Sequence, residues 1–240
     1  MPILTDKDKT MNSIAHYYLL QINDALFPIG AYSHSYGLET YIQKGLIKNA
    51  SEASQYLKNK LCYAVLYSDL LGARLAYDYT LSNDLHKLIE LNTLTTALKS
   101  PMEMREASFK LGSRFIKTIE ALKLPLEDTS YYAFTHQAST SKLHHCCLYG
   151  SFCAAMEISK EAMLTHYLYA QTSAIVTTCV KTIPLSQTEG QQILSESYPL
   201  LSELTHKVLT LDANWYGCST PSFDIRSMQH ECLYSRLYMS

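Results

Sequence analysis

Two short segments of this 240-residue chain carry residue types that could do chemistry. The first holds Ser33, His34 and Ser35, with a hydroxyl nucleophile on either side of a possible base. Covalent catalysis needs the base within hydrogen-bond reach of the nucleophile and a third group that orients the base. Side chains adjacent in sequence rarely reach each other in that geometry, and no orienting acid is apparent. The pattern favours a specific turn or a partner-binding surface over a hydrolytic site.

The second segment places four potential metal ligands in a row, His144, His145, Cys146 and Cys147. Successive residues of a helix point about 100° apart, so this run cannot close a tetrahedral site by itself. No C-x-x-C pair elsewhere in the sequence could complete one. The segment therefore favours packing and hydrogen bonding, and contact with a transition metal stays open as the alternative.

The signatures of common enzymes are absent from the sequence. It contains no P-loop, no Gly-rich dinucleotide turn, no nucleophile elbow and no H-E-x-x-H. A helical enzyme with a buried haem or di-iron centre would need a proximal His or paired Glu-x-x-His motifs, and Glu203 with His206 supplies only one copy. We therefore expect a protein that is not an enzyme and binds no cofactor and no metal at a site of its own.

Charge and cysteine content indicate which partners and which cellular location to expect. The chain has 20 Lys+Arg against 22 Asp+Glu, without a basic block, so nucleic acid and anionic membranes are not expected as partners. Seven cysteines without framework spacing, and an N-terminus without a signal-peptide pattern, predict a cytoplasmic chain with reduced thiols. Residues 162–180 run for 19 positions without a charge, but polar groups such as His166 and Gln171 favour a buried central helix over a membrane span.

Composition predicts an all-α fold. Leu occurs 35 times and Val only 4 times, and Gly and Pro are scarce at 8 and 7. We expect a mobile tail over residues 1–12 and, over residues 13–240, a single-domain helical bundle of about ten helices. Ser100 with Glu103, and Ser186 with Glu189, form capping boxes that mark helix starts. The expected helices span residues 17–26, 51–76, 84–98, 101–122, 127–137, 144–158, 160–180, 187–197 and 198–211, followed by a last helix capped by Ser222.

The sequence is rich in tyrosine and poor in charge. It holds 19 Tyr, and charged residues make up 18% of the chain, below the roughly 25% of average proteins. Abundant Tyr with little charge is typical of interface cores. We therefore expect surfaces that bind protein partners.

Four blocks of sequence resemble the urease accessory protein family UreF, and most closely its Helicobacter-like members: residues 24–39, 167–171, 180–191 and 228–238. The resemblance implies an all-helical scaffold that forms a homodimer, binds UreD (UreH in some bacteria) and recruits the GTPase UreG to deliver nickel to apo-urease. Cys146 and Cys147 stand where similar proteins have apolar residues, so the resemblance leaves open whether this segment contacts nickel. The alternative is a helical adaptor unrelated to urease.

We expect two kinds of contact surface. The dimer interface should centre on a nearly uncharged stretch that exposes tyrosines, at Tyr167, Tyr169 and Gln171. The C-terminal residues should become ordered on binding UreD, with Arg236 bound to backbone carbonyls or to a carboxylate such as Glu39. The expected partner-binding residues are Pro28, Gly30, Tyr32, His34, Gly37, Glu39, Lys181, Tyr234, Arg236, Leu237 and Tyr238.

Overall fold

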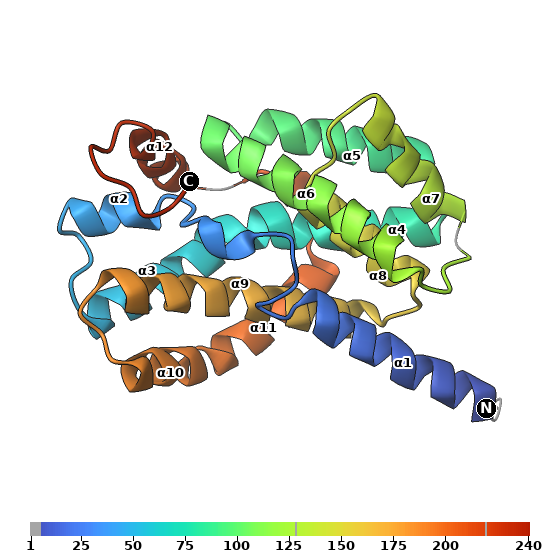
Figure 1. Ribbon diagram of the computed structural model, residues 1–240, viewed down its shortest axis with the longest axis horizontal. Helices are drawn as coiled ribbons and strands as arrows, with labels where there is room; N and C mark the ends of the chain where they lie inside the picture. The colour runs from blue at the N-terminus through green and yellow to red at the C-terminus, as the bar shows by residue number, and fades with distance from the viewer. Residues whose placement is uncertain (1–5, 128, 219) are drawn as a thin grey trace.

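The computed structural model describes residues 6–127, 129–218 and 220–240, and only the backbone of residues 6–13. Throughout these residues the chain is helical without a strand, which confirms the all-α prediction (Figure 1). The α-helices are α1 (Asp6–Ile22), α2 (Leu38–Gln43), α3 (Ala50–Lys60), α4 (Leu71–Leu81), α5 (Leu85–Leu98), α6 (Met102–Leu122), α7 (Thr129–His136), α8 (His145–Ala155), α9 (Lys160–Thr182), α10 (Gln187–Glu196), α11 (Tyr198–Thr210) and α12 (Pro221–His230). Short 3-10 turns at Ala31–Ser33, Gln137–Ser139 and Ala213–Trp215 connect them.

The centre of the bundle is the packing of α8 on α4. Every residue of α8 from His145 to Ala154 is buried, so this helix has no solvent face. Gly150 lies so close to α4 that an added Cβ would stand 2.0 Å from the main-chain oxygen of Ala73. Small residues on a helix face allow this close approach.

Helix α9 contains the long uncharged run, and it packs against α8 and α11 among others. Two of its buried polar side chains are satisfied within the helix, since Thr172 donates to the Leu168 carbonyl and Thr178 to that of Ala174. The expected central helix is present but only one side of it is buried, because Thr165, Tyr169 and Thr177 are exposed. Within the described ranges, no helix is both long and apolar enough to cross a membrane.

A π-helix, Leu61–Leu70, joins α3 to α4. Wider turns free carbonyl groups from the regular ladder, and two of them accept hydrogen bonds from the loop before α12. The Gly217 N–H donates to the Tyr67 carbonyl at 2.8 Å and the Thr220 N–H to the Tyr63 carbonyl at 3.0 Å. The expected helix over residues 51–76 is thus continuous but changes its winding in the middle. It also begins earlier than expected, because Asn49 and not Ser51 is its cap.

Of the four predicted helix caps, Ser51, Ser100 and Ser222 are wrong and Ser186 is right. The Ser186 box is confirmed, with both hydrogen bonds to Glu189 present. Helix α6 instead starts after Pro101 without a side-chain cap, because the carboxylate of Glu103 is bound elsewhere in the fold. Helix α12 starts after Thr220 with Pro221 in its first turn, one residue before the predicted cap Ser222.

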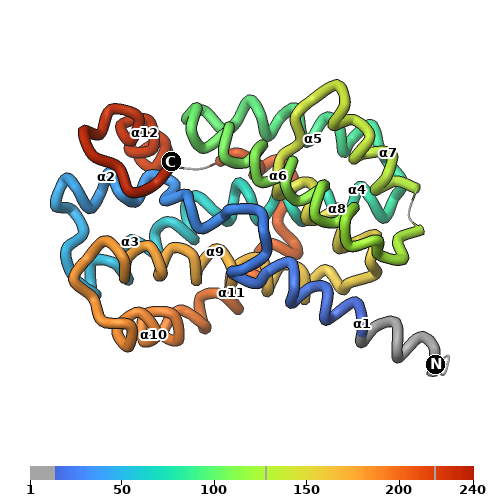
Figure 2. Tube along the Cα trace, viewed as in Figure 1, coloured from blue at the N-terminus to red at the C-terminus, as the bar shows by residue number. Residues whose placement is uncertain are grey.

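Helices α1 and α12 lie at opposite ends of the molecule (Figures 1 and 2). Helix α1 extends away from the bundle, beginning at Asp6 and not near residue 17 as expected. Of the expected mobile tail, residues 1–5 lie outside the described residues, and the mobility of the rest stays a prediction. At the other end, α12 packs beside α2 and the following residues return across both helices (Figure 2).

Candidate partner-binding site

The turn between α1 and α2 depends on two glycines with positive φ. Gly30 has φ 80° and Gly37 has φ 83°, a region that side chains strain to adopt. Both also lack room for a Cβ, since Arg114 covers Gly30 and Ser227 of α12 covers Gly37. Arg114 donates to the Ile29 carbonyl at 3.2 Å, which fixes the turn on α6. The segment is therefore the specific turn that the sequence favoured, built by backbone shape.

The C-terminal residues dock on this turn. The Met239 N–H donates to the Ser33 carbonyl at 2.8 Å, and the Tyr36 N–H donates to the main-chain oxygen of Ser240 at 3.0 Å. His34 Nδ1 lies 2.8 Å from Ser240 Oγ. Burial, helped by the positive charges of Lys110 and Arg114, lowers the pKa of His34 to about 4, so this ring is neutral near pH 7. The segment is thus docked on its own chain in this structure. The expectation that it becomes ordered on binding UreD stays a prediction.

Two carboxylates, the buried Glu39 and the half-buried Glu103, hold the rest of the C-terminal segment. Glu39 accepts the N–H of Leu237 at 2.8 Å and that of Tyr238 at 3.2 Å. Arg236 pairs with Glu103 at 2.6 Å. The sequence predicted a carboxylate partner for Arg236 correctly in kind, but the example it named, Glu39, binds the neighbouring amides instead.

An open cleft of about 350 Å³ brings residues from distant blocks together. Its lining includes Tyr32 and Lys181 from the expected partner surface, Tyr238 from the docked segment, and Tyr169 and Gln171 from the expected dimer interface. The two contact surfaces, which the sequence treated as separate, therefore border one cleft.

Exposure divides the expected contact residues into two groups. The side chains of Pro28, Tyr32, Lys181, Tyr234, Arg236 and Leu237 are exposed, as is Tyr169, while Tyr238 and Gln171 are half-buried. Gly30, His34, Gly37 and Glu39 are buried. These four residues lie beneath the exposed ones and support them, so the expectation that they touch a partner directly does not fit their positions.

Tyr167 requires a correction. We expected this stretch to expose its tyrosines, but Tyr167 is only 3% exposed and packs against Tyr149 with ring centroids 4.9 Å apart. It is buried because the rings of His145 and Tyr149 on α8 pack against it. Tyr167 therefore supports α9 from inside, and only Tyr169 and Gln171 remain for a contact between subunits.

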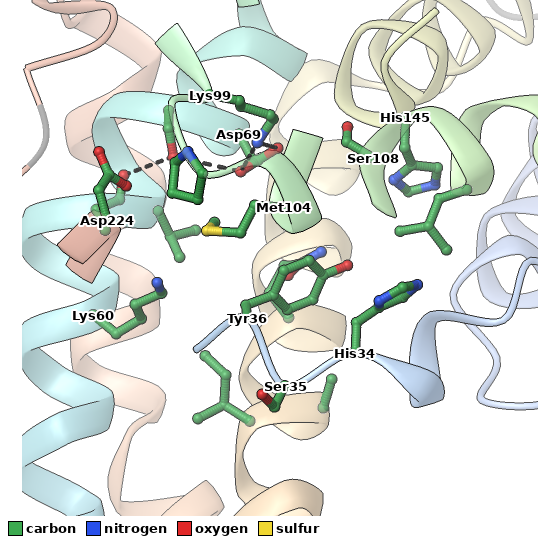
Figure 3. A pocket seen from close by; sticks show the side chains of 18 of the residues that line it. His34, Ser35, Tyr36, Lys60, Asp69, Lys99, Met104, Ser108, His145 and Asp224 are labelled. Carbon is green, nitrogen blue, oxygen red and sulfur yellow. Dashed lines mark hydrogen bonds and ion pairs between the residues drawn. The ribbon is translucent and has the colours of Figure 1, made fainter. Parts of the chain in front are cut away.

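Behind the turn lies an interior cavity of about 80 Å³ (Figure 3). Asp69 and Lys99 pair in its wall at 2.9 Å. Burial opposes the charge on Asp69, but the charge and hydrogen bonds of Lys99 lower its pKa below the ordinary value. Lys60 faces the same cavity, and burial lowers the pKa of its ammonium to about 8. No sequence motif singled out these charged residues. The one available signal was that Lys60 lies three and four residues after Leu57 and Tyr56, on the same side of the helix.

The His-His-Cys-Cys segment serves packing. His144 has both ring nitrogens in hydrogen bonds, 3.0 Å from Ser108 Oγ and 3.0 Å from Thr96 Oγ1, and burial lowers its pKa to about 3. Cys146 and Cys147 are fully buried, and the hydrogen bond that the Cys146 thiol makes to Cys147, together with burial, raises the pKa of that thiol. Among the described residues, no three His, Cys, Asp or Glu side chains are arranged to hold a metal ion.

Comparison with known proteins gives a family. The sequence model described as UreF matches residues 47–198. A urease accessory protein UreF of Actinobacillus pleuropneumoniae serotype 5b is 35% identical over 225 residues, covering 92% of this chain and 97% of that protein. The UreF of Haemophilus influenzae is 35% identical over 92% of this chain and 94% of its own length, and that of Lachnoclostridium phytofermentans is 33% identical over 92% and 97%.

Proposed function

Since the chain belongs to the UreF family of urease accessory proteins, we propose that it is a cytoplasmic maturation factor for the delivery of nickel to apo-urease. The family's proteins are accessory factors and not enzymes, in agreement with the missing catalytic signatures. Its role is that of a scaffold, which dimerises, binds UreD or UreH, and recruits the GTPase UreG. Family membership also removes the alternative of an adaptor unrelated to urease.

The observation that carries the recruitment proposal is the cleft of about 350 Å³ with the docked C-terminal segment at its edge. Tyr32 is 72% exposed there and offers an aromatic anchor of the kind that dominates binding energy at interfaces. Lys181 lies in the last turn of α9, after an uncharged run, where the helix dipole favours a cation. An exposed cation that lines the same cleft as an aromatic anchor suits an acidic patch on the GTPase.

Dimerisation is assigned to the exposed side of α9. Tyr169 is 43% exposed, and its ring centroid lies 6.4 Å from that of Tyr198 on α11. Two partly exposed tyrosines with no charge between them suit the core of an interface between two copies. Since the same cleft is lined by Tyr32 and Tyr169, dimerisation and GTPase recruitment use adjoining surfaces.

The recruitment proposal is tested by capture experiments with purified components. The tagged chain, in complex with UreD, is incubated with UreG, and the retained UreG is measured for wild type, Tyr32→Ala and Lys181→Ala. Matched controls are Tyr63→Ala and Lys117→Ala, because both residues are exposed and neither lines the cleft.

The two cleft variants should retain much less UreG, with UreD binding and helicity unchanged. Retention equal to that of the controls contradicts the proposed surface. Loss of UreD binding and helicity together would show a folding defect and would also remove this support for the cleft.

A further inference from the structure

Two histidines that are far apart in the sequence meet where α1 lies on α9. The rings of His16 and His166 have centroids 5.7 Å apart and planes that cross at 84°. Among the ring pairs of the described residues, this is the one that joins two histidines. Neither ring makes a hydrogen bond with another described residue. Their nitrogens are therefore available to a ligand from solution.

Buried neighbours hold the backbone on both sides of this pair. On α1, Ala15 and Leu19 are buried in the core, and on α9 so is Tyr167. The packing of α1 on α9 fixes where the two side chains begin (Figure 1), while the rings can still turn about χ2, which is a broad torsion for histidine. His16 is exposed and His166 half-buried, so water reaches one side of the pair.

The separation of the rings fits two imidazoles that share a metal ion. A ligating imidazole nitrogen stands about 2.1 Å from Zn²⁺, which puts the centres of two such rings roughly 4.5 to 6 Å apart, depending on the angle at the metal. The 5.7 Å between His16 and His166 lies within this range. A turn of each ring about χ2 is the adjustment that directs one nitrogen of each toward a common point.

The electrostatic surroundings of His166 also suit a cation. An imidazole binds a metal ion only when it is neutral. Burial, followed by the positive charge of His16, lowers the pKa of His166 below its ordinary value, so this ring is neutral near pH 7. The buried His144 differs, because the charge of Lys99 also lowers the pKa of that ring. A lysine beside the ring would repel a metal ion.

We propose that His16 and His166 together bind one divalent transition-metal ion that prefers imidazole, such as Zn²⁺ or Ni²⁺, with water completing its coordination, and that the ion links α1 to α9. Imidazole suits these metals, whereas Mg²⁺ and Ca²⁺ take oxygen ligands. The site departs from the expectation that the chain binds no metal of its own. No sequence pattern predicts it, because the fold brings the two histidines together. It does not rest on the proposed function.

Equilibrium dialysis measures the affinity of this site. The untagged full-length chain is dialysed at about pH 7 against Zn²⁺ or Ni²⁺, and against Mg²⁺ as the negative probe. Loss of one ligand in His16→Gln or His166→Gln should weaken binding at least about 10-fold. The matched controls are His86→Gln and His206→Gln, since each ring lies near one carboxylate, at 3.5 Å and 3.9 Å. All these proteins keep the same thiols, so metal bound by cysteine does not distinguish them.

The results divide clearly. Tighter binding of Zn²⁺ or Ni²⁺ by the wild type and the two controls than by the two site variants supports the proposal. Absence of binding, equal affinity in all five proteins, or equal binding of Mg²⁺ overturns it.

A second measurement uses only the wild-type chain, so it does not depend on the folding of a variant. Diethyl pyrocarbonate acylates neutral imidazole nitrogens, and mass spectrometry gives the rate at each histidine. At a free metal concentration ten times the dissociation constant, the site is about nine-tenths occupied, and both His16 and His166 should react about 10-fold more slowly. His86 and His206 should react at unchanged rates. Unchanged rates at His16 and His166, or equal slowing at all four, contradict the proposal. Since no partner is used, this outcome is separate from the capture experiments above.

Discussion

The close approach of α8 and α4 can be tested by adding a single methyl group. In Gly150→Ala, the new Cβ would stand 2.0 Å from the Ala73 main-chain oxygen and 2.9 Å from its carbonyl carbon, whereas ordinary contacts begin near 3.4 Å. The obstacle is backbone, which cannot rotate away as a side chain can. Helices α8 and α4 would therefore have to separate by more than an ångström along buried surfaces.

The size of the effect follows from two opposing contributions. Overpacking of a rigid core costs about 3 kcal/mol, and Ala in place of Gly inside a helix recovers about 1 kcal/mol. The net loss of about 2 kcal/mol corresponds to a Tm lower by about 4 to 8 °C for a chain of this size.

Thermal unfolding followed by circular dichroism measures this loss. The matched control is Gly190→Ala in α10, where the nearest atom to a new Cβ is a side-chain methyl group of the half-buried Val180. Because this side chain can rotate, we expect the free energy of unfolding of the control to change by no more than about 1 kcal/mol. An unchanged or raised Tm in Gly150→Ala, or equal losses in both variants, would refute the argument from backbone contact.

Three further predictions concern acid stability, dimerisation and the C-terminal segment. Burial lowers the pKa of His144 to about 3 and that of His145 to about 4, so the unfolded chain takes up protons that the folded chain excludes. The stability present above about pH 6.5 is therefore lost as the pH falls toward 4. The urea midpoint should drop between about pH 7 and about pH 5, and less so in His144→Gln, whereas a midpoint that does not change with pH would contradict this. Tyr169→Asp should weaken a dimer by about 2 to 5 kcal/mol if the side chain is buried there, seen as a shift to monomer in size exclusion with light scattering of the complex with UreD, and an unchanged oligomer would count against the assigned interface. Deletion of residues 234–240 should abolish UreG recruitment while the main thermal transition persists, and retained recruitment would show that the docked segment is not needed.

Local sequence signals predicted the helices well and the caps unevenly. The Ser186 box is correct because both of its residues are free to bind each other on the surface. The Ser100 box has the same pattern, but Glu103 is used by His230 and Arg236, more than a hundred residues away in sequence. The π-helix likewise has long-range partners, since its Tyr67 and Tyr63 carbonyls accept hydrogen bonds from the N–H groups of Gly217 and Thr220 in a distant loop. Such long-range competition cannot be read from the spacing of one segment.

The sequence predicted several residues of the candidate site but not how they are arranged. Composition pointed to tyrosine-rich contact surfaces, and Tyr32, Lys181 and Tyr169 do line one exposed cleft. Which tyrosines are buried depends on neighbours that only the fold provides, and Tyr167 was placed on the wrong side for this reason. His230 contacts both Glu39 and Glu103 and so joins three helices, and no local sequence pattern predicts these contacts.

The central claim is that this chain is needed to activate urease. Apo-urease is incubated with nickel, GTP, UreD and UreG, with or without this chain, and urea hydrolysis is then measured. We predict activation that depends on this chain and that falls for Tyr32→Ala and Lys181→Ala but not for the controls Tyr63→Ala and Lys117→Ala. Equal activation with and without the chain would contradict the account.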